Sequence, residues 1–150
     1  PHIGAQIYSW IRWQDKKVVG TAAAALLLDR QREAIAKLKA KNITVKVNTV
    51  VIPTINTNHI PEIARDMAAL KVDLHNLIAL IPVPGTRLAA TPPPSPQLMA
   101  ALRQAAEHHL PQMRHCMRCR ADATGLLGRV SLQDNISTCN SSLAAQTTQT

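Results

Sequence analysis

The segment ITVKVNTVVI, residues 43–52, constrains the fold most, because its side chains alternate in character with the period of two that a β-strand requires. One face of the predicted strand carries Ile43, Val45, Val47, Thr49 and Val51. The opposite face carries Lys46 and Asn48 near its middle. The first face is expected to pack under helices. The second is expected to meet solvent in an antiparallel sheet, or a ligand cavity in a barrel.

Helical patterns lie on both sides of this strand and a second strand follows it. A helix is predicted from Gly20 to about residue 42 with Thr21 as its cap, a second is capped by Asn58, and a third begins at Ser95. The second strand, residues 74–83, is apolar on both faces after His75 and Asn76, as is typical of a buried parallel strand. This order predicts an α/β fold with a parallel sheet.

Two strands are too few for a stable parallel sheet, so we expect an incomplete domain, the second half of a larger α/β fold. The start of the chain, which has neither an initiator Met nor a signal peptide, agrees with this expectation. Residues 1–20 are expected to form a loop or short turn packed on a neighbour. The Ser/Thr/Gln-rich residues 129–150 are expected to be a disordered or aberrant tail, which leaves residues 1–128 as the folded part.

Composition excludes several functional classes. No run of eighteen apolar residues occurs, so a membrane span is not expected. The formal net charge is +8, but aromatic residues make up only 2% of the chain, and nucleic acid is therefore not an expected partner. The three cysteines fit a reducing compartment, and a cytoplasmic location is predicted.

The motif RHCMRCRADATG, residues 114–125, contains the highest concentration of reactive and metal-binding side chain types in the chain, with thiols at Cys116 and Cys119. A Cys-x-x-Cys pair can be half of a zinc site, a redox-active pair, part of an iron–sulfur site, or simply two buried thiols. The spacing alone does not distinguish these four interpretations. The nearby histidines and Cys139 do not complete a standard zinc spacing. The missing metal ligands must therefore come from elsewhere.

Several stretches together resemble one family, the NifB proteins of nitrogenase FeMo-cofactor biosynthesis, which are radical S-adenosylmethionine (SAM) enzymes. The matching stretches are IGAQIYSWIRW, LLLDRQREAIAKLKAKNITVKVNTVVIP, HIPEIA, DLHNLIALIPVPGT and LPQMRHCMRCRADATGLLG. The last contains the family's Cys-x-x-Cys-Arg-x-Asp-Ala-x-Gly signature at every fixed position.

The resemblance implies a partial βα barrel, of which this chain is the second half, with 4Fe-4S clusters and SAM as cofactors. Two 4Fe-4S units would be fused around a methyl-derived carbide. Cys116 and Cys119 would ligate one substrate cluster, with Arg120 and Asp122 fixing the loop, and the implied partners are iron–sulfur cluster donors and the carrier or scaffold proteins of nitrogenase assembly. Lys46 and Asn48 would line the cavity near SAM, an assignment that rests on the strand pattern and the resemblance together.

The chain also departs from the family. It lacks the Cys-x-x-x-Cys-x-x-Cys loop of the radical-generating cluster, and Thr54 and Ala79 stand where the family has Gly and Pro. We therefore expect this chain to be inactive alone, with the missing ligands upstream of Pro1. The alternatives are a small zinc-binding or interaction module that uses Cys116 and Cys119, and a degenerate remnant without activity.

Overall fold

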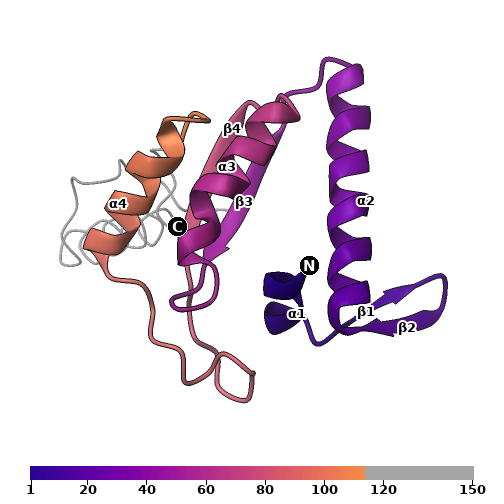
Figure 1. Ribbon diagram of the computed structural model, residues 1–150, viewed down its shortest axis with the longest axis vertical. Helices are drawn as coiled ribbons and strands as arrows, with labels where there is room; N and C mark the ends of the chain where they lie inside the picture. The colour runs from indigo at the N-terminus through magenta and orange to yellow at the C-terminus, as the bar shows by residue number, and fades with distance from the viewer. Residues whose placement is uncertain (114–150) are drawn as a thin grey trace, which may run out of the picture. The chain divides into compact units, whose positions relative to one another are not determined.

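The computed structural model describes residues 1–113, which form one compact unit (Figure 1). In chain order its elements are α1 (His2–Ile7), β1 (Trp10–Trp13), β2 (Lys16–Val19), α2 (Gly20–Ala40), β3 (Lys46–Val51), the short 3-10 helix η1 (Thr57–His59), α3 (Ile60–Ala69), β4 (Leu74–Ala79) and α4 (Pro96–Glu107). No helix within residues 1–113 is long and apolar enough to cross a membrane. The division predicted at residue 128 lies outside the described residues.

The first nineteen residues are more regular than the sequence indicated. We expected a loop or short turn, but residues 2–7 are helical and β1 pairs with β2 in an antiparallel hairpin. The turn consists of Gln14 and Asp15, whose φ angles of 48° and 60° are both left-handed, as a two-residue hairpin turn requires. Such turns are usually recognised by an Asn-Gly or Asp-Gly pair, which this segment does not contain.

The helix α2 forms where the alanine-rich run predicts it, but its start differs from the prediction. Val19 is its N-cap residue and no side chain caps it, so the prediction that Thr21 caps this helix was wrong. Near this end α1 crosses α2 closely. A Cβ on Gly4 would lie 2.8 Å from the Ala24 Cβ, so only glycine allows this approach.

The strands β3 and β4 form the parallel sheet that the order of helices and strands predicted (Figure 1). Their register pairs Lys46 with Leu74 and continues in step to Val51 and Ala79. Helices α3 and α4 cover one face of this sheet, on which the buried residues Val51, Ile60, Ala64, Leu77, Met99 and Ala106 form one core cluster. Burying this apolar surface is the main force that holds the helices on the sheet.

A second core cluster lies at the other end of the sheet. It contains Ile35 from α2, Val45, Met67, Val72 and Leu110. Both strands are shorter than predicted, ending at Val51 and Ala79 rather than at residues 52 and 83. In α4, Met99 and Ala106 are buried, whereas Ala101 is exposed.

The α/β class and the parallel pairing are therefore confirmed, whereas the barrel is not seen. Within residues 1–113 the structure contains two small sheets of two strands each, one antiparallel and one parallel.

Candidate ligand face of the parallel sheet

The face of the β3–β4 sheet opposite α3 and α4 is the candidate functional site. Strand register places one set of side chains there, namely Lys46, Asn48 and Val50 from β3 and Leu74, Asn76 and Ile78 from β4. We call this set the ligand face. Lys46 and Asn48 are exposed, as the alternating pattern predicted, and Val50 is 42% exposed. The sequence-predicted residues therefore lie together, on the side of the sheet that α3 and α4 do not cover.

Two asparagines meet at the centre of the ligand face. Asn76 is directly opposite Asn48 in the register, and its Nδ2 donates a hydrogen bond to the Asn48 Oδ1 at 3.2 Å. Asn76 is only 2% exposed, and its Oδ1 has no hydrogen-bond partner within residues 1–113. A buried acceptor without a partner is costly and calls for a functional explanation. The sequence analysis missed Asn76, although pairing the two strands in register would have revealed it.

Among residues 1–113, no strand pairs with the outer edge of β3 beside the ligand face. Odd-numbered residues of β3 bond to β4, as the Val45 and Val51 carbonyls do in accepting from Leu74 and Leu80. The main-chain groups of Lys46 and Asn48 therefore point away from β4, and within residues 1–113 they have no partner on that side. An open edge of this kind can accept another strand.

The far end of the same edge is closed by a side chain. The amide of Asn56, which is 4% exposed, accepts from the Ile52 N–H and donates to the Val50 carbonyl, both at 2.8 Å. Asn56 thus takes the place of a neighbouring strand at those two residues. Any added strand can pair with β3 only around Lys46 and Asn48.

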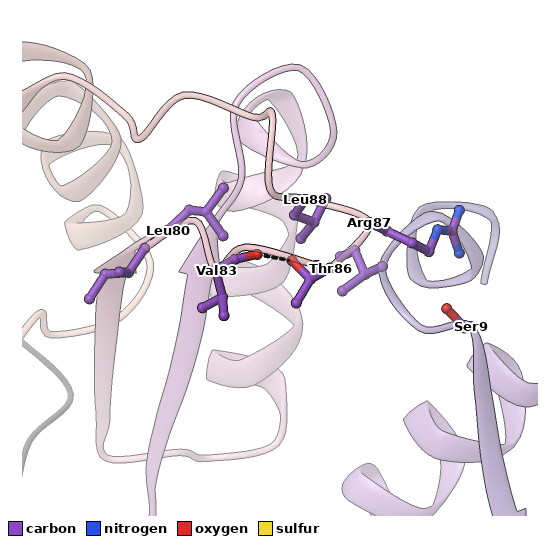
Figure 2. Close-up of a pocket in the computed structure, with 9 residues that line it drawn as sticks. Ser9, Leu80, Val83, Thr86, Arg87 and Leu88 are labelled. Atoms are coloured by element: carbon purple, nitrogen blue, oxygen red, sulfur yellow. Dashed lines mark hydrogen bonds between the residues drawn. The ribbon is translucent and has the colours of Figure 1, made fainter.

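A surface cavity of about 490 Å³ lies beyond the carboxyl end of β4, where parallel α/β sheets bind their ligands (Figure 2). Its lining consists of Ile7, Ser9, Leu80, Ile81, Val83 and residues 85–88. The Thr86 hydroxyl is tied to the Val83 carbonyl at 2.8 Å, which holds the loop closed on itself (Figure 2). The Arg87 guanidinium and the Ser9 hydroxyl are the polar groups left for a ligand.

Two further polar side chains lie near β4, of which His75 is buried and Arg103 is half-buried. His75 is fully buried, and burial lowers its pKa to about 4. Arg103 reaches from α4 to donate to the Leu77 carbonyl at 3.1 Å, and burial also lowers its pKa. The sequence pattern placed His75 only at the start of the second predicted strand.

The cysteine motif cannot be compared with this geometry. Cys116, Cys119, Arg120 and Asp122 lie outside the described residues. Within residues 1–113 no three His, Cys, Asp or Glu side chains are grouped so that they could hold a metal ion.

Comparison with known proteins gives a consistent result across several organisms. The chain is 40% identical over 131 residues to the FeMo cofactor biosynthesis protein NifB of Chlorobaculum tepidum, covering 87% of this chain and 31% of that protein. It is 44% identical to NifB of Herbaspirillum seropedicae, over 85% of this chain and 25% of the relative. Against NifB of Methanocaldococcus jannaschii the identity is 35%, over 85% of this chain and 41% of the relative. The chain is a homologue of NifB.

The similarity covers most of this chain but only a minor part of each relative. This chain spans 25–41% of the length of these three relatives. No protein-family model matches the chain.

Proposed function

We propose that this chain contributes sheet strands and a cluster-binding arm to a NifB-type radical SAM protein of FeMo-cofactor biosynthesis. The observation that carries the proposal is the sequence identity of 35–44% to NifB proteins over 85–87% of the chain. The proposed reaction fuses two 4Fe-4S substrate clusters with insertion of a carbide. Its partners would be iron–sulfur cluster donors and the carrier or scaffold proteins of nitrogenase assembly.

The open edge of β3 supports a role within a larger sheet. The main-chain groups of Lys46 and Asn48 on that edge have no partner among the described residues, while Asn56 blocks the positions beyond them. A preceding strand paired at this edge would extend the sheet toward the partial barrel of radical SAM enzymes. The ligand face would then become an inner wall, because α3 and α4 cover the opposite face.

The ligand face fits SAM in its chemistry. The unpaired Asn76 Oδ1 is an acceptor for a hydroxyl or amino group, Lys46 is a cation suited to a carboxylate, and Val50 offers apolar surface. When bound beside a 4Fe-4S cluster, SAM would supply radical chemistry at this face. Lys46, Asn48 and Asn76 would orient the molecule, and the sheet would help to exclude water.

The cysteine pair is the proposed arm for one substrate cluster. Thiolates are the usual protein ligands of iron–sulfur clusters, and Cys116 and Cys119 supply two of them. Arg114, Arg118 and Arg120 would offset the negative charge of a thiolate-bound cluster, and Asp122 would fix the loop beside Arg120. The radical-generating cluster needs ligands that this chain does not contain, so the chain alone is expected to be inactive.

A chimera tests the proposal. This chain's residues 1–128 replace the matching segment of Chlorobaculum tepidum NifB, and FeMo-cofactor formation is measured in extracts that lack NifB. Restored formation supports the proposal, and its absence in a folded, iron-loaded chimera contradicts it. The double variant Cys116→Ala, Cys119→Ala should hold less iron after anaerobic iron and sulfide loading. Unchanged iron content would contradict the arm, and stoichiometric zinc without iron uptake would favour a zinc-binding module.

A further inference from the structure

His75 is a buried histidine for which the proposed function has no use. It lies on the helix-covered face of the sheet, fully buried, with its ring Nε2 2.9 Å from the Thr49 hydroxyl of β3. No acidic side chain forms an ion pair with it within residues 1–113, so it is not kept as a charged partner. A polar ring in a core is retained for the hydrogen bonds that it makes.

The main chain of His75 holds the last described segment of the chain. Its N–H donates to the Pro111 carbonyl at 2.9 Å, and its carbonyl accepts from the Met113 N–H at 2.7 Å. These two bonds form an isolated parallel bridge that places Gln112 beside His75. The segment from Pro111 to Met113 is therefore attached to the outer edge of β4 at this residue.

Side-chain geometry determines which ring nitrogen carries the proton. Gln112 Nε2 donates to the Leu110 carbonyl at 2.8 Å, which fixes the amide orientation, because a flipped amide would set two acceptor oxygens against each other. The same Nε2 lies 3.5 Å from His75 Nδ1 and directs its second hydrogen there. Nδ1 is therefore the acceptor, and Nε2–H donates to Thr49. A protonated Nδ1 would oppose the Gln112 amide, so both geometry and burial favour the neutral ring.

We propose that His75 is a positioning residue whose neutral Nε2–H tautomer, held between Thr49 and Gln112, fixes the segment that leads into the Cys116–Cys119 pair. Only two residues separate Met113 from Cys116, and three residue steps of extended chain span at most about 11 Å. Because Gln112 and Met113 are anchored, the length of the chain after Met113 limits which positions the Cys116 thiol can reach. We call the contacts of His75 with Thr49 and with residues 111–113 the anchor. Its role in positioning the cysteine pair rests on the proposed function, whereas the anchor itself rests on contacts among described residues.

The anchor is tested first in the 150-residue chain without iron. Nitrogen NMR of ¹⁵N-labelled histidine at pH 7 should show His75 with a protonated Nε2 and a bare Nδ1. Hydrogen exchange at the Met113 amide should be at least tenfold faster in His75→Leu. His75→Asn should restore much of the protection, because its Oδ1 replaces the Nδ1 acceptor facing Gln112. The matched control His109→Leu changes an exposed histidine close by and should leave Met113 exchange unchanged.

The outcomes separate the anchor from the proposed function. A protonated Nδ1 in the unmodified chain overturns the anchor, even if His75→Leu fails to fold, and so does unchanged Met113 exchange in a folded His75→Leu or His75→Asn. In the chimera, iron content after loading should fall at least twofold in His75→Leu and recover in His75→Asn. If the double cysteine variant loses iron while His75→Leu does not, the positioning role is wrong and the proposed arm stands. If the double cysteine variant keeps its iron, the proposal that Cys116 and Cys119 bind a cluster is wrong.

Discussion

Asn76 of β4 donates a hydrogen bond to Asn48 of β3 across the ligand face, 3.2 Å from nitrogen to oxygen, in a sheet whose other paired residues are mostly apolar. The pair leaves the buried Asn76 Oδ1 without a partner in residues 1–113. An unsatisfied buried acceptor costs about 1–3 kcal/mol. An unsatisfied acceptor that is kept in a sheet despite this free-energy cost is typical of a surface that binds a polar molecule.

Replacing Asn76 should separate stability from function. Asn76→Leu removes the unpaired acceptor and keeps the branched shape of the side chain, although leucine is larger. The free energy of unfolding should therefore change by no more than about 1 kcal/mol in either direction. In the chimera the same change should abolish cofactor formation, because the polar group on the ligand face is lost. Urea unfolding followed by circular dichroism measures the first effect. Lys46→Ala, at an exposed position on the same face, is the stability control and should change the free energy of unfolding by less than about 0.5 kcal/mol. Destabilisation by Asn76→Leu beyond about 2 kcal/mol would show that Asn76 is structural.

Asn56 should matter far more than its neighbour Asn58. Asn56→Ala leaves the Ile52 N–H and the Val50 carbonyl unpaired, so we expect a loss of about 2–4 kcal/mol in the free energy of unfolding. Asn58→Ala is the matched control. Asn58 is exposed and does not cap α3, whose N-cap residue is His59, so the predicted cap was wrong and the loss should be close to zero. Equal effects from the two variants would contradict the edge-blocking role of Asn56.

The caps of α4 and α2 offer a similar comparison. Ser95 accepts from the Leu98 N–H at 3.1 Å, as the sequence predicted, so Ser95→Ala should cost about 1 kcal/mol. Thr21 lies inside α2 and makes no cap, so Thr21→Ala should be neutral or slightly stabilising. Thermal unfolding of both variants tests this, and a larger loss in Thr21→Ala would contradict the observed helix start.

The sequence predicted those parts of the fold that depend on local periodicity. The alternation around Val47 and Thr49 identified β3 and its two faces, and Ser95 with Pro96 identified the start of α4. The hairpin at Gln14 and Asp15 was missed, because its left-handed turn is made without glycine.

The candidate site was predicted only in part, because it depends on contacts between segments distant in sequence. Lys46 and Asn48 follow from one strand's pattern, but Asn76 joins them only through the register of the sheet. The role of His75 depends on Gln112, thirty-seven residues later in the chain. No single-strand pattern contains these relationships.

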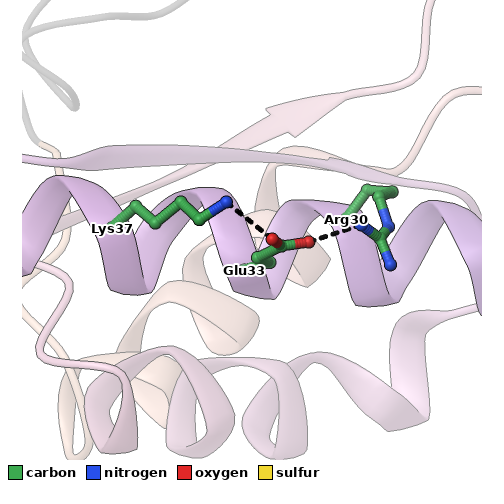
Figure 3. Close-up of polar contacts among 3 residues, drawn as sticks. All are labelled: Arg30, Glu33 and Lys37. Atoms are coloured by element: carbon green, nitrogen blue, oxygen red, sulfur yellow. Dashed lines mark hydrogen bonds and ion pairs between the residues drawn. The ribbon is translucent and has the colours of Figure 1, made fainter.

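The exposed ion pairs of α2 should contribute little. Glu33 lies between Arg30 and Lys37 and contacts each at 2.6 Å (Figure 3). The hydrogen bond from Lys37, together with the charges of Arg30 and Lys37, lowers the Glu33 pKa. Because all three side chains are exposed to solvent, Glu33→Gln should shift the melting temperature only slightly, and the shift should disappear in 1 M salt. A large, salt-independent shift would show that Glu33 has a partner beyond this helix.

Acid should destabilise the fold through His75. Its pKa is about 4 in the folded chain and near 6.5 when the chain is unfolded, so the ring is neutral in both states above pH 6.5. Between pH 6.5 and 4 the unfolded state binds a proton that the folded state does not, and the free energy of unfolding should fall by roughly 3 kcal/mol. Urea unfolding at pH 7, 6 and 5 measures this slope. The slope should persist in the control His109→Leu and be lost in His75→Asn, which cannot titrate; a slope that survives in His75→Asn would assign the acid sensitivity to another group.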